Sequence, residues 1–118
     1  MKVNLAEKLA KISTHWDPHV AAELNGQCVK LAKLHGAFIW HKHDDEDELF
    51  LVVKGSLRMA FRDREEVINE GEFIVVPKGV EHKPIADKEV EVMLFEPKET
   101  LNTGDQDHAL TKKQLKHI

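Results

Sequence analysis

The sequence of 118 residues contains no tyrosine and a single cysteine, Cys28. Without tyrosine, any mechanism that needs a tyrosyl acid or radical is excluded. A lone cysteine cannot form an internal disulfide, which is typical of a protein in the reducing cytoplasm, and we expect that location. Cys28 itself is expected to be a small buried apolar residue, because no neighbour in the sequence would activate its thiol.

Long apolar runs and an excess of positive charge are also missing. No run approaches the roughly 18–20 residues that span a bilayer. Residues 1–16 have no continuous apolar segment, so no signal peptide is expected. The formal net charge is −4, whereas a protein that binds nucleic acid normally carries a basic stripe. We therefore expect neither a membrane nor a nucleic-acid partner.

The length fits one domain. Val3, Leu5, Leu9 and Ile12 recur at roughly helical spacing, which predicts a short N-terminal helical extension over residues 1–16 that covers a sheet. Residues 17–97 carry strand and turn signals and are expected to form the domain proper. Residues 98–118 are polar and are expected to form a C-terminal tail.

Short runs rich in Val, Ile, Leu and Phe alternate with turn residues through the domain. Asn25-Gly26 is a strong hairpin signal, because both central residues of that turn take positive φ. Many short strands at close spacing predict an all-β sandwich or barrel rather than a parallel α/β sheet. The expected strands are Val20–Leu24, Gln27–Leu34, Ala37–Trp40, Glu48–Val53, Leu57–Phe61, Phe73–Val76 and Val90–Phe95.

Histidines and carboxylates gather in the middle of the chain. His41 and His43 stand two residues apart on an expected strand, so both rings can point the same way. An acidic run follows, and His82 lies on a later hairpin. Three imidazoles with one carboxylate suit Mn, Fe, Co, Ni, Cu or Zn, whereas Mg and Ca prefer oxygen ligands. The carboxylate could come from Glu46, Asp47 or Glu48, and the rest of the acidic run is expected to be a solvated loop.

The spacing of these residues resembles the two motifs of the cupin family. Gly36-x4-His41-x-His43-x4-Glu48-x6-Gly55 is similar to the first motif, and Gly71-x5-Pro77-x-Gly79-x2-His82 to the second. The gap before His41 is one residue shorter than is usual, and Ala86 stands where the family commonly has Asn. The resemblance is to small single-domain bacterial cupins, often labelled as related to mannose-6-phosphate isomerase.

The resemblance implies an all-β fold, a jelly-roll-like closed cupin barrel with a short N-terminal helix. It also implies one divalent transition metal (Mn, Fe, Ni, Zn or Cu), and its motif spacing selects Glu48 as the carboxylate ligand. The expected metal ligands are thus His41, His43, Glu48 and His82.

Alternation about the expected ligands places two sets of apolar side chains. The inward set is expected to line the pocket: Ile39, Phe50, Val52, Met59 and Phe61. Phe38, Trp40, Leu49, Leu51 and Val53 would face outward. A strand that is apolar on both faces must be covered on both, either by a second sheet or by a second subunit. Small cupins are often dimers, so the resemblance favours a homodimer.

Two functions from different classes remain open. One is a metal-dependent oxygenase or isomerase that acts on a small oxygen-bearing molecule. The other is a non-catalytic ligand-binding or sensor domain whose metal only orients a small molecule. A metal-free structural role is a third reading that leaves the ligand set unexplained. No cluster of inward Lys or Arg would hold a phosphate, so a sugar-phosphate substrate is not expected. The sequence assigns no catalytic residue.

Overall fold

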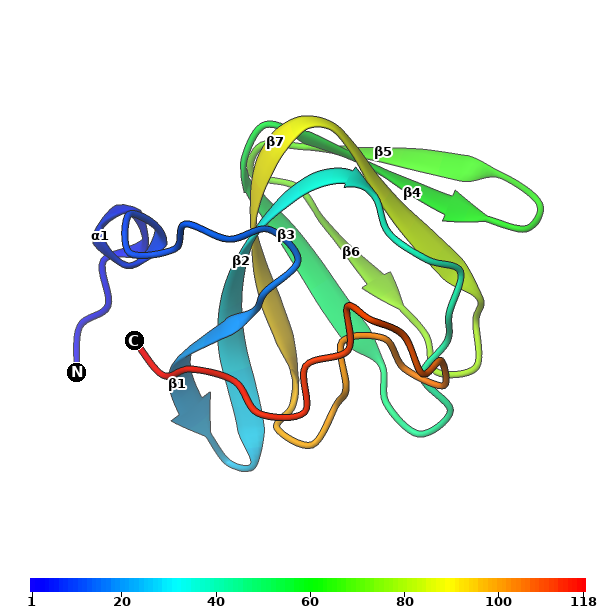
Figure 1. The fold of residues 1–118 in the computed structure, drawn as a ribbon. Helices are drawn as coiled ribbons and strands as arrows, with labels where there is room; N and C mark the ends of the chain where they lie inside the picture. The colour runs from blue at the N-terminus through cyan, green and yellow to red at the C-terminus, as the bar shows by residue number, and fades with distance from the viewer.

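The computed structural model describes residues 1–118 and contains one short helix and seven strands (Figure 1). The strands belong to one sheet with the order β1-β2-β7-β3-β6, and β4 joins it by pairing with β7 and β5. This path does not close on itself, so the expected closed barrel is a strongly curved but open sheet. The elements are α1 (Leu5–Leu9), β1 (His19–Leu24), β2 (Gln27–Ala37), β3 (Glu48–Lys54), β4 (Ser56–Phe61), β5 (Glu65–Asn69), β6 (Phe73–Val76) and β7 (His82–Pro97).

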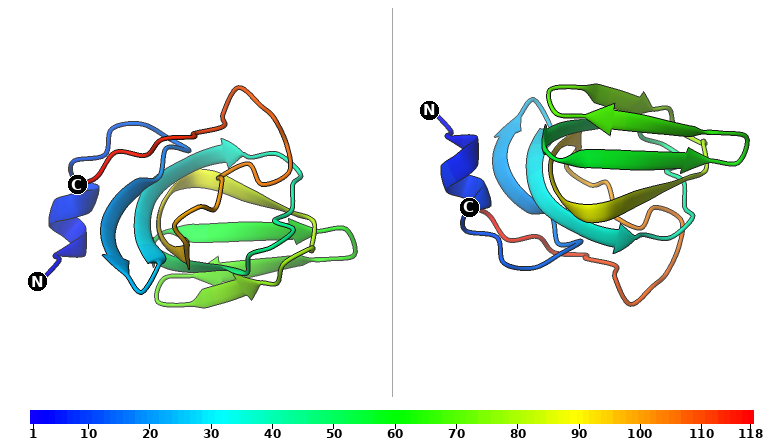
Figure 2. Two further views of the ribbon diagram at one scale, coloured as in Figure 1. Left: turned by 90° about the horizontal axis from the view of Figure 1, so that it is seen from below. Right: turned by 90° about the horizontal axis from the view of Figure 1, so that it is seen from above.

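Strand β7 organises the barrel. It runs for 16 residues, well beyond the expected strand Val90–Phe95, and pairs antiparallel with β2, β3 and β4. Its residues alternate between buried and partly exposed positions from Val90 onward, as expected for a strand with one face on a core. Seen end-on, the strands curl around one interior (Figure 2). That interior is filled by a cluster of 13 buried apolar residues, among them Val52, Leu57, Met59 and Val92.

The turn between β1 and β2 is the one that the sequence predicts. Asn25 has φ of 50° and Gly26 φ of 77°, the two positive values that an Asn-Gly hairpin turn requires. The prediction of this hairpin is confirmed.

Helix α1 covers the outer side of β2. Asn4 caps it by accepting a hydrogen bond from the Glu7 amide through its side chain. Leu9 and Ile12 are buried together with Leu31, and Val53 packs against the same group. The prediction of a short helix over a sheet face is confirmed, although the helix has only five residues. It is far too short to cross a membrane, and no other helix is present.

The C-terminal tail returns to the barrel. The Val20 amide donates to the Lys116 carbonyl at 2.8 Å, and the Ile118 amide donates to the Val20 carbonyl at 2.9 Å. Nearer the metal-binding motifs, the Asp105 amide donates to the Lys42 carbonyl at 3.0 Å. The side chain of Thr103 is completely buried. The tail is therefore a packed part of the domain (Figure 2, orange to red).

The predicted strand over residues 37–40 is wrong. β2 ends at Ala37, after a register shift between Leu34 and Gly36, and the next residues form a loop. Because Gly36 has φ of 87°, alternation does not continue through it. Phe38 is consequently buried rather than outward, and β5 is a strand that the sequence prediction left out.

Candidate metal centre and its pocket

The two motifs meet through their backbones. The His41 amide donates to the His82 carbonyl at 3.1 Å, and the His82 amide donates to the His41 carbonyl at 2.9 Å. This isolated bridge holds the two imidazoles with ring centroids 4.3 Å apart. His41 and His82 are 41 positions apart in the sequence, and these main-chain hydrogen bonds fix them side by side.

Backbone carbonyls also orient two of the rings. The Nδ1 atom of His41 lies 2.9 Å from the Ile39 carbonyl, and Nδ1 of His82 lies 2.9 Å from the Val80 carbonyl. A carbonyl can only accept, so each Nδ1 carries the proton and each Nε2 has a free lone pair. In metal-binding histidines, an acceptor such as a backbone carbonyl commonly binds the ring N–H that does not face the metal, and it thereby fixes the tautomer.

His43 and Glu48 complete the group. Glu48 is the first residue of β3, and its Oε1 lies 3.2 Å from His43 Nε2 and 3.6 Å from His82 Nε2. One ligand atom from each of His41, His43, Glu48 and His82 lies within 4.8 Å of the others. All four side chains are buried. The structure therefore brings together the four residues expected to bind metal.

The atoms that point into this group lack partners. Both nitrogens of His43, Glu48 Oε1 and His82 Nε2 are buried without a hydrogen bond. Buried polar atoms left unpaired cost free energy and are rare in native proteins. A divalent cation among them would pair with Glu48 Oε1, His82 Nε2 and one nitrogen of His43 at once, so the donor set fits a metal.

Burial and mutual contacts shift the pKa values of the group. Burial, with a further contribution from His82, lowers the pKa of His41 to about 4, so this ring is neutral at pH 7. Burial lowers the pKa of His43 as well, but its close contact with the Glu48 carboxylate outweighs burial and raises that pKa. Burial also opposes ionisation of Glu48, yet its close contacts with Glu96, His43 and His82 hold its pKa well below the usual value. A neutral imidazole and an ionised carboxylate are the forms that bind metal.

A second buried charged pair lies beside the group and was missed by the sequence analysis. Lys30 Nζ lies 2.8 Å from Glu96 Oε1, and both side chains are only 2% exposed. Glu96 pairs with Cys28 across β7 and β2, so Lys30 is its diagonal neighbour on the inward face. Burial and the nearby charge of Glu48 raise the pKa of Glu96 well above its usual value. The available signal was a lysine in the apolar alternation of residues 28–34.

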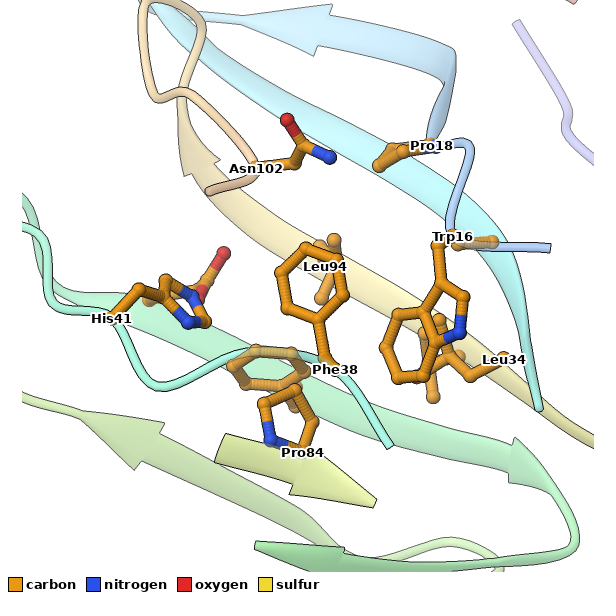
Figure 3. A pocket seen from close by; sticks show the side chains of 12 residues that line it. Trp16, Pro18, Leu34, Phe38, His41, Pro84, Leu94 and Asn102 are labelled. Carbon is orange, nitrogen blue, oxygen red and sulfur yellow. The ribbon is translucent and has the colours of Figure 1, made fainter. Parts of the chain in front are cut away.

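A pocket opens from this candidate metal site toward the N-terminal segment (Figure 3). His41 and Glu48 stand at one end, and Trp16, Pro18 and Asn102 come from outside the seven strands. The Trp16 and Phe38 rings are stacked, with centroids 4.7 Å apart and planes inclined by 21°. The remaining walls are apolar: Ala32, Leu34, Phe50, Pro84, Val92 and Leu94.

The expected pocket lining is largely corrected. Phe50 lines the pocket beside His41, as expected. Val52, Met59 and Phe61 are instead buried in the core cluster, and Ile39 is half-buried without lining this pocket. The reason is the loop after Gly36, which turns Phe38 inward in place of Ile39. Trp16 and Asn102 could not be found by strand alternation, because neither lies on a strand.

Comparison with known proteins tests the family resemblance. The sequence pattern of the family described as "Cupin domain" matches residues 29–98, more than half of the chain. The chain belongs to the cupin family. Its match to residues 29–98 covers both motifs and all four residues of the candidate metal site.

Several similar cupins have solved structures. A cupin-2 domain protein from Shewanella frigidimarina NCIMB 400 is 46% identical, with a TM-score of 0.81 over 81% of this chain and 94% of the other. Protein NMB1881 from Neisseria meningitidis is 34% identical, with a TM-score of 0.77 over 82% of this chain and 99% of the other. Among curated proteins, the uncharacterized protein YdbB of Bacillus subtilis is 41% identical over 63 residues. That match spans 52% of this chain and 56% of YdbB, so it covers about half of each. The family and the barrel are therefore shown, and they define no substrate.

Proposed function

We propose that this cupin binds one divalent transition metal through His41, His43, Glu48 and His82 and uses it on a small oxygen-bearing molecule. The observation that supports this most directly is the set of buried, unpartnered nitrogen and oxygen atoms that face one another. When bound, Mn, Fe, Ni, Zn or Cu would polarise a substrate oxygen, and iron or copper could also activate dioxygen. The proposed reaction class is accordingly oxygenation or isomerisation.

The protein residues supply binding and orientation. Ile39 and Val80 carbonyls hold the His41 and His82 rings with Nε2 available. The largely apolar pocket ends at His41 and Glu48 and gives a ligand a route to them.

Elemental analysis of untagged protein purified without chelators tests the proposal. We expect about one transition metal per chain, and a His82→Ala variant should lose it, because His82 provides a fully buried ligand. His35→Ala is the control, since His35 is exposed on β2 and lies outside the group. If the wild-type protein takes up no first-row metal even after reconstitution, the proposal is wrong.

A second candidate function is non-catalytic binding of the same kind of ligand. One observation favours it: among the residues that line the pocket, only the expected ligands His41 and Glu48 are acids or bases. A catalyst that moves protons usually adds a separate acid or base. Tight binding without any turnover in air, for protein loaded with iron or with copper, would support this alternative over the enzyme.

We also propose that the protein forms a homodimer through the outer face of β3, β6 and β7. Leu51 pairs with Phe73 and Met93, and Leu49 with Val75 and Phe95, so six apolar side chains lie in two rows on this face. Phe73 is 62% exposed, and β6 is an edge strand. Sedimentation should give a dimer for the wild-type protein and a monomer for Phe73→Glu. A wild-type monomer at all concentrations would contradict this.

A further inference from the structure

The pocket beside the metal-binding group has an unusual division between its polar and apolar parts. The end formed by His41 and Glu48 carries the unpaired Glu48 Oε1, whereas the side walls are mostly carbon. Phe38 lies between the two, with its ring centroid 5.3 Å from that of His41 and 4.7 Å from that of Trp16 (Figure 3). A ligand that reaches the metal-binding end must therefore lie against aromatic carbon.

The few polar atoms of the walls are already used by the protein. Trp16 Nε1 donates to the His35 carbonyl at 2.9 Å. Asn102 Nδ2 donates to the Leu110 carbonyl at 2.8 Å, and Asn102 Oδ1 accepts from the Lys112 amide at 2.8 Å. A sugar would leave several hydroxyl groups buried against these walls without partners, at a cost for each.

The charges around the pocket also argue against a phosphorylated ligand. No Lys or Arg lines the pocket, so nothing in the walls would pair with a phosphate or with a second carboxylate. Lys30, the one buried residue among Lys and Arg, is paired with Glu96 and also donates to the Thr100 carbonyl at 3.3 Å. A divalent cation whose ligands include a single carboxylate suits a neutral or singly negative oxygen.

Resting on the proposed function, we propose that the substrate or ligand is a small aromatic alcohol of the phenol class. Its single oxygen faces the group of His41, His43, Glu48 and His82. Its ring and any apolar substituent lie against Phe38, Trp16 and Leu94. The aromatic walls provide ring contacts that an aliphatic alcohol makes less well.

Calorimetric titration of the zinc-loaded wild-type protein separates the parts of this proposal, with zinc content measured on the same samples. The four probes are 4-methylphenol, toluene, 4-methylcyclohexanol and mannose 6-phosphate. We expect 4-methylphenol to bind at least about tenfold more tightly than toluene, which has no oxygen, and than the non-aromatic alcohol. Mannose 6-phosphate should bind weakest.

Two matched variants locate the site. Trp16→Ala should weaken binding of 4-methylphenol by roughly tenfold with zinc content unchanged, because it removes a wall of the pocket. Trp40→Ala is the control, since Trp40 is half-buried, stacks under Arg62 at 3.9 Å and does not line the pocket. Equal effects of the two variants would place the phenol elsewhere and overturn the proposal.

The outcomes distinguish this inference from the proposed function. Stoichiometric zinc with no 4-methylphenol binding, or with tighter binding of the sugar phosphate, would overturn the phenol class and leave the metal site standing. Failure to bind zinc or any other first-row metal would overturn the proposed function and this inference with it. The wild-type titrations decide between these outcomes even if Trp16→Ala does not fold.

Discussion

Two groups of buried polar side chains lie inside this cupin barrel, and they differ in how their atoms are satisfied. The group of His41, His43, Glu48 and His82 leaves four atoms without a partner. The pair of Lys30 and Glu96 is joined by a 2.8 Å contact, Lys30 also donates to the Thr100 carbonyl, and one atom of the pair, Glu96 Oε2, lacks a partner. Burial alone therefore does not mark a ligand site. The difference is one of number: four unpaired atoms gather in the first group and one is left in the pair, and the cluster of four indicates where a cation belongs.

Removing one member of the Lys30–Glu96 pair should have the largest effect on the free energy of unfolding. Lys30→Met leaves the Glu96 carboxylate buried beside Glu48 and should lower the free energy of unfolding by about 3–5 kcal/mol. The double variant Lys30→Met with Glu96→Leu should recover most of this loss, because it removes both buried charges. Urea unfolding of the metal-free protein measures both.

That double variant also tests the division between the two groups. It should keep its metal, since neither residue belongs to the ligand set. A double variant that remains folded but has lost the metal would show that Lys30 and Glu96 are part of the metal site.

The group of His41, His43, Glu48 and His82 should instead make the stability of the fold depend on metal. At a free metal concentration 1,000 times the dissociation constant, binding should stabilise the wild-type fold by about 4 kcal/mol. His82→Ala should remove this gain, whereas Lys30→Met should retain it. Thermal unfolding with and without zinc measures the effect, and an equal metal shift in wild type and His82→Ala would contradict the assignment of His82.

Acid should also destabilise the metal-free protein, because His41 is buried as a neutral ring. The His41 pKa of about 4 lies below the usual 6.5, so the unfolded chain binds this proton more readily. Stability from His41 is fully present above pH 6.5 and is lost as the pH falls toward 4, on the order of 3 kcal/mol in all. His43, with a raised pKa, acts in the opposite sense and above pH 6.5.

The contribution of His41 is isolated by difference. His41→Gln should flatten the fall in stability between pH 6.5 and 4.5 relative to the wild-type protein, and His35→Gln, at an exposed position, should not. The raised pKa of Glu96 adds a term of opposite sign in this range, which cancels because all three proteins share it. Identical pH profiles for wild type and His41→Gln would show that His41 titrates normally.

The difference between the two groups also explains what the sequence could and could not predict. The four metal-binding candidates were found because a ligand set requires particular residue types at spacings that motifs record. Lys30 and Glu96 have no such signature, since their contact depends on the register between β2 and β7, 66 positions apart. The inward position of Phe38 follows from the irregularity at Gly36, which period-2 alternation does not anticipate. Trp16 and Asn102 reach the pocket only through tertiary packing of the two terminal segments.

The tail touches both groups and gives the smallest predicted effect. Gly104 has φ of 58°, and a Cβ atom there would overlap the Lys42 carbonyl oxygen, which lies between His41 and His43 in the chain. Gly71 has a similar φ of 78° with no atom near its missing Cβ, so Gly71→Ala is a matched control for backbone strain alone.

Gly104→Ala should destabilise by about 1–2 kcal/mol more than Gly71→Ala, because backbone atoms must shift to admit the methyl group. Since Lys42 also accepts from the Asp105 amide, the shift should loosen the His41–His43 segment and weaken metal binding, while leaving the contact of Lys30 with Glu96 intact. Zinc affinity and urea unfolding of the two variants measure this, and equal values for both would mean that the tail packs on the barrel without supporting the metal-binding group.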